Sequence, residues 1–129
     1  LTFPISATGM AGMEAIASNL VERGDEVIVC INGVFGGRMK DIMERCGAVV
    51  HTVEAEWGEI ITDEAVGEAV QAHPKASLMT IVHAETSTGT LTPVEEISKN
   101  TFIKTDKQKK FKECPKNNTH HTCNLIFDV

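Results

Sequence analysis

Polar side chains gather in residues 83–89, which read HAETSTG and follow the apolar run 77–82 directly. Such a run is typical of a buried strand, and ligands of open α/β sheets bind just beyond the carboxyl ends of these strands. The segment supplies an imidazole, a carboxylate and three hydroxyls. Thr86 and Ser87 can donate hydrogen bonds to an anion or to a phenolate-type oxygen. The competing interpretation is that the hydroxyls only cap a turn and that His83 is a core histidine.

Residues 6–14, with the sequence SATGMAGME, place small residues and hydroxyls at the start of a helical pattern. A helix N-terminus offers free backbone N–H groups and a partial positive charge, which together suit a phosphate group. Thr8 would add a hydroxyl donor, and Gly9 would let an anion approach the backbone closely. Taken alone, this segment is more often an ordinary capped helix start.

Residues 32–38, with the sequence NGVFGGR, read as a loop from a strand to a helix. Phe35 is flanked by glycines in a chain whose aromatic content is only 5%. A ring held there could stack on a flat heteroaromatic ligand. A role as core filler under a glycine-rich turn is an equally good interpretation.

Helical and strand patterns alternate between these segments. Apolar residues at helical spacing predict helices, and short apolar runs predict strands. The predicted helices cover residues 10–23, 38–46 and 62–73, with a fourth opening at Thr92–Pro93, and the predicted strands cover 26–31, 48–53 and 77–82. The alternation predicts an α/β fold of three layers, a mainly parallel sheet with flanking helices. All three polar segments would then lie at the carboxyl edge of one sheet.

The whole-chain totals exclude several function classes. A net charge of -6 over 129 residues argues against non-specific nucleic-acid binding. The sequence has neither an apolar run long enough to cross a bilayer nor the pattern of a signal peptide. We therefore expect no membrane partner and a soluble intracellular protein, cytoplasmic or, in a eukaryote, peroxisomal or mitochondrial. The start at Leu1, directly in this pattern, leads us to expect an incomplete domain.

The composition changes after Lys99. Residues 100–129 carry a net charge of +3 and residues 1–99 one of -9, and the later segment lacks helical periodicity. With little apolar surface to bury, residues 100–129 are predicted to be a disordered basic tail, unrelated to the domain of residues 1–99. The tail contains two cysteines and two histidines, whose spacing fits no standard zinc pattern: Cys114, His120, His121 and Cys123. We expect no metal site.

Together, the three polar segments describe a pyridoxal phosphate pocket, and residues 1–99 resemble the class V aminotransferases of fold type I. They are most similar to the alanine–glyoxylate and serine–glyoxylate group, over roughly the first half of its large cofactor domain. The resemblance implies that Thr8 and Gly9 hold the phosphate of pyridoxal 5'-phosphate, that Phe35 covers its ring, and that Thr86 bonds to its phenolic oxygen. Met10 belongs to the same cofactor-binding loop, where many members carry His, so its role is not polar. Many members carry Trp or Tyr at the position of Phe35.

The resemblance also implies a reaction, the transfer of an amino group from alanine or serine to glyoxylate. The full-length relative would bind an amino acid and a 2-oxo acid and form a homodimer. The family's mechanism needs a lysine that binds the cofactor covalently, an aspartate for its pyridinium nitrogen and an arginine for the substrate carboxylate. The matching segment ends before all three. We therefore expect no catalytic residue in this chain and no activity of the chain alone.

Two alternatives remain open. The chain could be a non-catalytic, truncated isoform that pairs with full-length subunits. It could also derive from a cysteine desulfurase-like enzyme, because such enzymes share a His-x-Glu-x-x-x-Gly segment like residues 83–89. Residues 32–38 favour the glyoxylate group instead.

Overall fold

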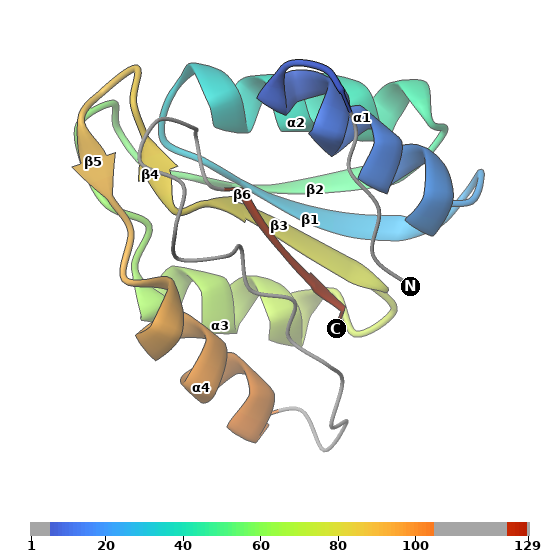
Figure 1. Cartoon of the computed structure of the whole chain (residues 1–129). Coiled ribbons are helices and arrows are strands. Elements are labelled where there is room, and N and C mark those ends of the chain that lie inside the picture. The colour runs from blue at the N-terminus through green and yellow to red at the C-terminus, as the bar shows by residue number, and fades with distance from the viewer. Residues whose placement is uncertain (1–5, 105–123, 129) are drawn as a thin grey trace.

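The computed structural model describes residues 6–104 and 124–128 (Figure 1). These residues form a sheet in the strand order β2-β1-β3-β6 and a separate two-stranded hairpin, β4-β5. Strand β1 pairs in parallel with β2 and β3, whereas β6 runs antiparallel to β3. Along the chain the elements are α1 (Gly9–Leu20), β1 (Glu26–Ile31), α2 (Val34–Arg45), β2 (Val49–Glu54), α3 (Asp63–Ala72), β3 (Leu78–Val82), β4 (Ala84–Glu85), β5 (Thr90–Leu91), α4 (Val94–Lys104) and β6 (Asn124–Asp128).

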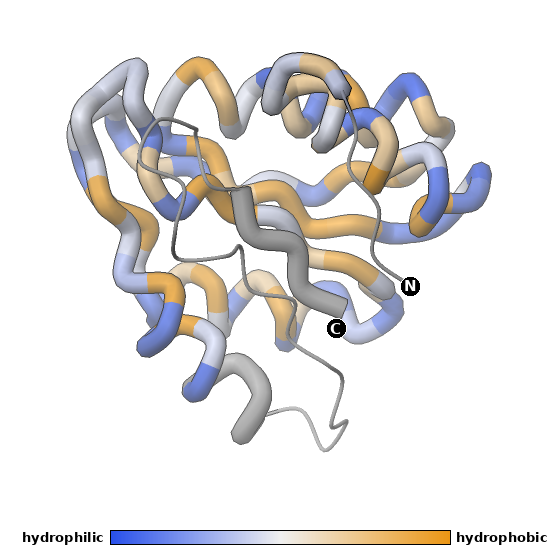
Figure 2. The backbone as a smooth tube through the Cα atoms, viewed as in Figure 1, coloured by the Kyte–Doolittle hydropathy of each residue, from blue (hydrophilic) through white to orange (hydrophobic). Residues whose placement is uncertain are grey.

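Helices cover both faces of the sheet, α1 and α2 on one side and α3 and α4 on the other (Figure 1). Side chains alternate along a strand, so β1 feeds both cores. Val27 and Val29 pack toward α1 and α2, while Ile28 and Cys30 pack toward α3 and α4. Hydrophobic residues accordingly concentrate along the central strands in Figure 2. The three-layer, mainly parallel α/β architecture is confirmed. None of the helices in the described residues combines the length and the apolar character needed to cross a membrane.

Helix α1 ends at Leu20, three residues before the predicted end at residue 23. Val21 already has extended backbone angles and is buried in the core beside α1. The Asp25 carboxylate then accepts a hydrogen bond from the backbone N–H of Glu22 at 2.9 Å. This local turn competes with a further turn of α1, which is the physical reason why the helix ends before residue 23.

The carboxyl-terminal segment holds two features that the sequence did not predict. Residues 124–128 form strand β6 and pair with β3 from Leu78↔Asp128 to Val82↔Asn124, while disorder of the tail stays a prediction. The exposed edge of a sheet offers unpaired backbone groups, so a short apolar run such as LIF can be recruited to it. Helix α4 also continues across the proposed boundary at residue 99/100. Residues 105–123 lie outside the described residues, and with them Cys114, His120, His121 and Cys123, so the expectation about metal binding there stays a prediction.

Burial of Cys30 yields a testable chemical property. This side chain is 1% exposed, and burial raises the pKa of its thiol from 9.0 to about 12. The fold favours the protonated thiol, so this contribution to stability is fully present below pH 9 and is lost as the pH rises from 9 toward 12. We expect native Cys30 to resist iodoacetamide at pH 8 and to react once urea unfolds the chain, as mapped by mass spectrometry. Half-buried Cys46 is the internal comparison. Equal labelling of Cys30 and Cys46 in the native protein would contradict the burial of Cys30.

Candidate functional site

Glu85 is the centre of the polar network at the carboxyl edge of the sheet. It lies on the hairpin strand β4, just after β3, and its side chain is fully buried. One carboxylate oxygen, Oε2, accepts hydrogen bonds from the backbone N–H groups of Phe35 at 3.0 Å and Gly36 at 3.2 Å. The first N–H groups of a helix have no partner within the helix, and a negative charge there also interacts favourably with the helix dipole. The hairpin therefore supplies the cap of α2.

Ser87 completes this cap. Its hydroxyl donates to Oε1 of Glu85 and accepts from the backbone N–H of Val34 at 3.0 Å. The Ser87 backbone N–H donates to the same Oε1 at 3.3 Å. Three consecutive N–H groups at the start of α2 are thus paired with side chains about 50 residues away in the sequence.

Two glycines allow this close approach. A Cβ at Gly33 would lie 2.5 Å from Cγ of Glu85 and 2.7 Å from Oγ of Ser87, so a larger residue would push the cap apart. A Cβ at Gly36 would lie 2.8 Å from the carbonyl oxygen of Cys30, because α2 packs directly on the backbone of β1. Both positions therefore require glycine for this close packing.

A second set of hydrogen bonds fixes the other side of the hairpin. The buried Asn32 amide donates to the carbonyl oxygen of Glu59 at 3.0 Å and to the hydroxyl of Thr90 at 3.1 Å. The hydroxyls of Thr88 and Thr90 are 3.0 Å apart. The turn from Thr86 to Gly89 is therefore held at its base to the segments that follow β1 and β2.

Phe35 lies in the first turn of α2, and the prediction that it sits in a loop and that the helix begins at residue 38 is wrong. The helix begins at Val34 because its cap is supplied by Glu85 and Ser87, a long-range contact that local sequence does not encode. The Phe35 ring is half-buried against the core beside α1 and α2, and the Arg38 guanidinium lies 5.6 Å from its centroid. This partial burial supports the interpretation that Phe35 fills the core. Stacking of the Phe35 ring on a ligand stays a prediction.

Thr86 is exposed in the turn of the hairpin, between Glu85 and Ser87. Because both neighbours bond to the start of α2, Thr86 and Phe35 belong to one connected unit. The structure thus brings together two of the segments chosen from the sequence. It also shows that Glu85 and Ser87 cap the start of α2. The only sequence signal for this capping role was the position of both residues directly after a buried strand.

Thr8, Gly9 and Met10 lie at the start of α1, on the same face of the sheet as α2 (Figure 1). Thr8 is the exposed N-cap residue, and its side chain makes no capping hydrogen bond. The first turn holds no acidic residue, and nothing lies within 4 Å of a Cβ built at Gly9. Met10 is half-buried against the neighbouring core. Binding roles for these three residues stay predictions.

Comparison with known proteins identifies the family. The family model "Aminotransferase class-V" matches residues 3–117, and the chain belongs to this family. It is 40% identical over 96 residues to the (S)-ureidoglycine–glyoxylate transaminase of Bacillus subtilis, covering 74% of the chain and 23% of that protein. It is 42% identical over 88 residues to the alanine–glyoxylate aminotransferase of Drosophila melanogaster, covering 68% of the chain and 22% of that protein.

A solved structure agrees with these sequence matches. The alanine–glyoxylate aminotransferase of Nostoc sp. superimposes with a TM-score of 0.68 at 40% identity, over 75% of this chain and 26% of that one. The predicted resemblance to class V aminotransferases is confirmed. The chain spans about a quarter of the length of the proteins it matches.

The buried cap can be tested by Glu85→Gln, which keeps the size of the side chain and removes its charge. The amide NH2 must then face either the α2 N–H groups or the Ser87 hydroxyl. Leaving buried donors unpaired costs about 1–3 kcal/mol each, so we expect the free energy of unfolding to fall by about 2–4 kcal/mol. Urea denaturation followed by circular dichroism measures it. The matched control is Glu59→Gln at an exposed side chain, expected within about 0.5 kcal/mol of the parent; similar losses in both variants would refute the cap.

The steric requirement at residue 33 can be tested by Gly33→Ala. Its methyl group would overlap Glu85 and Ser87, and we expect a loss of stability of about 2 kcal/mol or more, in the range of overpacked sites. Gly37→Ala, in the helix that follows Gly33, is the matched control, because a Cβ there meets nothing within 4 Å. Since alanine favours helix more than glycine, this control should gain up to about 1 kcal/mol. Equal effects of the two substitutions on the urea midpoint would contradict the packing argument.

Proposed function

We propose that this chain is the amino-terminal part of the cofactor domain of a pyridoxal phosphate-dependent aminotransferase that passes an amino group from alanine or serine to glyoxylate. The observation that carries the proposal is the Glu85 network, which joins Phe35 and the Thr86 turn in one unit. The names of two similar proteins, from Bacillus subtilis and Drosophila melanogaster, both include glyoxylate. They favour this function over the desulfurase-like alternative.

The residues present fit the cofactor by their chemistry. The open start of α1 suits a phosphate, because the Thr8 hydroxyl is not used for capping and no acidic side chain lies in the first turn. Gly9 leaves the backbone accessible, and Met10 would contribute an apolar wall. The half-buried Phe35 ring would cover one face of the pyridine ring, and the exposed Thr86 hydroxyl would donate to its phenolic oxygen. When bound, the cofactor supplies an electron sink for bonds at the α-carbon of the amino acid.

In this proposal the chain binds and orients the cofactor but does not complete the reaction. The environments of three lysines support this view. Lys40 lies 3.9 Å from Glu44 on the surface of α2. Lys75 precedes β3, at the edge of the sheet opposite the Glu85 network. The hydrogen bond that Lys99 donates to the Glu95 carboxylate raises the pKa of Lys99, which keeps this exposed amine protonated and poorly nucleophilic.

The cofactor site can be tested by Thr86→Val, measured by calorimetric titration of the full chain with pyridoxal 5'-phosphate. Loss of one hydrogen bond to a charged oxygen corresponds to about 1.5–3 kcal/mol, so we expect affinity to fall by about tenfold or more. Thr52→Val is the matched control, because Thr52 is an exposed threonine on β2. Failure of the parent chain to bind the cofactor, or equal losses in both variants, would contradict the site.

Catalytic incompetence has its own test. After incubation with pyridoxal 5'-phosphate and reduction with borohydride, we expect peptide mapping to find no pyridoxyl-lysine in residues 1–99 and assays to detect no alanine–glyoxylate transfer. An unrelated protein with many surface lysines, treated identically, serves as the control for non-specific labelling. A single stoichiometric pyridoxyl-lysine accompanied by turnover would overturn the claim that the chain alone is inactive.

A further inference from the structure

Glu26, His51 and His73 form a cluster at the amino edge of the sheet, opposite the Glu85 network. Glu26 begins β1, and His51 lies on the adjacent parallel strand β2. Their strands point alternate side chains toward α3, since Ile28 and Val53 belong to the core on that side. Helix α3 runs back across this face and ends at His73, its C-cap. Three elements that are distant in sequence therefore meet at one point.

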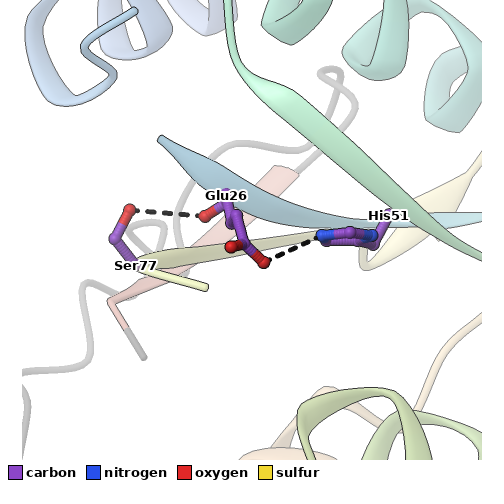
Figure 3. Close-up of polar contacts among 3 residues, drawn as sticks. All are labelled: Glu26, His51 and Ser77. Carbon is purple, nitrogen blue, oxygen red and sulfur yellow. Dashed lines mark hydrogen bonds and ion pairs between the residues drawn. The ribbon is translucent and has the colours of Figure 1, made fainter. Parts of the chain in front are cut away.

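The side chains of this cluster lie close together. His51 Nε2 lies 3.1 Å from Oε2 of Glu26, and a dashed line marks this contact in Figure 3. The rings of His51 and His73 stack with centroids 3.6 Å apart and planes at 13°. One ligand-type atom from each residue lies within 4.8 Å of those from the other two. Within the part of the chain that the structure describes, no hydrogen bond is found to a ring nitrogen of His73.

We propose that these three residues bind a divalent transition-metal ion, with Zn²⁺ as the best match, with water in the remaining position. Two imidazoles and one carboxylate are ligands that zinc accepts, and ligands 2.0–2.2 Å from a tetrahedral zinc are separated by about 3.4 Å. The 3.1 Å between His51 Nε2 and Glu26 Oε2 is close to that separation. A zinc ion bound by these two atoms would replace their direct contact.

The backbone holds two of the ligands in place. The Glu26 carbonyl oxygen accepts a hydrogen bond from the backbone N–H of Ser77 at 2.9 Å. It also accepts one from the Ser77 hydroxyl at 3.5 Å, which Figure 3 draws. His51 lies within the β1–β2 ladder, in register with Ile28. The side chains of Glu26 and His51 are 29% and 24% exposed, so an ion can enter from solvent without losing all its water.

His73 is the ligand that must move. The ring nitrogens of two stacked, parallel imidazoles direct their lone pairs in nearly parallel planes, so the lone pairs do not converge on one point. Coordination of a single ion by both rings therefore requires the His73 ring to tilt out of the stack. Its position at the end of α3 allows this rotation and adds a second attraction, since the carboxyl end of a helix carries partial negative charge that favours a cation. The bound ion would tie β1, β2 and the end of α3 together, independently of the proposed cofactor site.

The test titrates the full 129-residue chain, freed of metal by chelation, with Zn²⁺ and with Co²⁺ as a spectroscopic substitute. We expect one ion per chain, visible absorption typical of four-coordinate cobalt, and a melting temperature about 5–10 °C higher at a hundredfold excess of zinc over Kd. His73→Gln and Glu26→Gln should each weaken binding by at least about tenfold. Both apo variants are checked by circular dichroism for an unchanged fold.

The control removes every cysteine and histidine of the predicted tail, through Cys114→Ser, His120→Gln, His121→Gln and Cys123→Ser combined. Binding retained in this variant and lost in His73→Gln supports the cluster. The reverse pattern, or no binding by the parent chain, overturns it. Nuclear magnetic resonance of the unmodified chain gives a readout that needs no variant: zinc must shift the ring protons of both His51 and His73, and unshifted rings under saturating zinc would equally overturn it.

Discussion

The buried carboxylate of Glu85 is the interaction on which the carboxyl edge of this fold depends. It sits where β3 ends, and it pairs with N–H groups at the start of α2, which itself follows β1. A fully buried charge is costly unless several donors surround it. Here two α2 N–H groups and both donors of Ser87 do so, and the positive end of α2 adds to their effect. One side chain thereby fixes the relative position of a strand, a hairpin and a helix.

This arrangement explains why the edge can be rigid although it consists mostly of loops. The α2 start, the hairpin turn and the segment after β2 are cross-linked through Glu85, Ser87 and Asn32. Each link joins residues 27 to 58 positions apart, so the edge forms only when the parallel sheet has brought its strand ends together. Binding groups attached to such an edge, Phe35 and Thr86 in our proposal, lose little further entropy when a ligand arrives.

Periodicity in the sequence was sufficient to predict the layers, because β1 and the buried face of α2 follow simple alternation and helical spacing. It was insufficient where a long-range partner decides the outcome. The glycines around Phe35 disfavour helix locally, yet the cap from the hairpin starts α2 at Val34. Strand β6 likewise depends on the open edge of β3, which no local pattern reveals. For the site, the sequence pointed to the Thr86 segment but could not show that Glu85 and Ser87, on either side of Thr86, cap α2.

The helix dipoles give the two edges of the sheet opposite preferences. In a parallel α/β unit each helix starts at the carboxyl edge of the strands and ends at the amino edge. Partial positive charge therefore collects at the carboxyl edge, where α2 attracts Glu85 and where the open start of α1 suits a phosphate. Partial negative charge collects at the amino edge, where α3 ends at His73 beside Glu26. A cation bound there and an anion bound at the far edge would both lower the electrostatic energy of the same set of helices, so the topology that builds the proposed cofactor pocket also favours the proposed metal site.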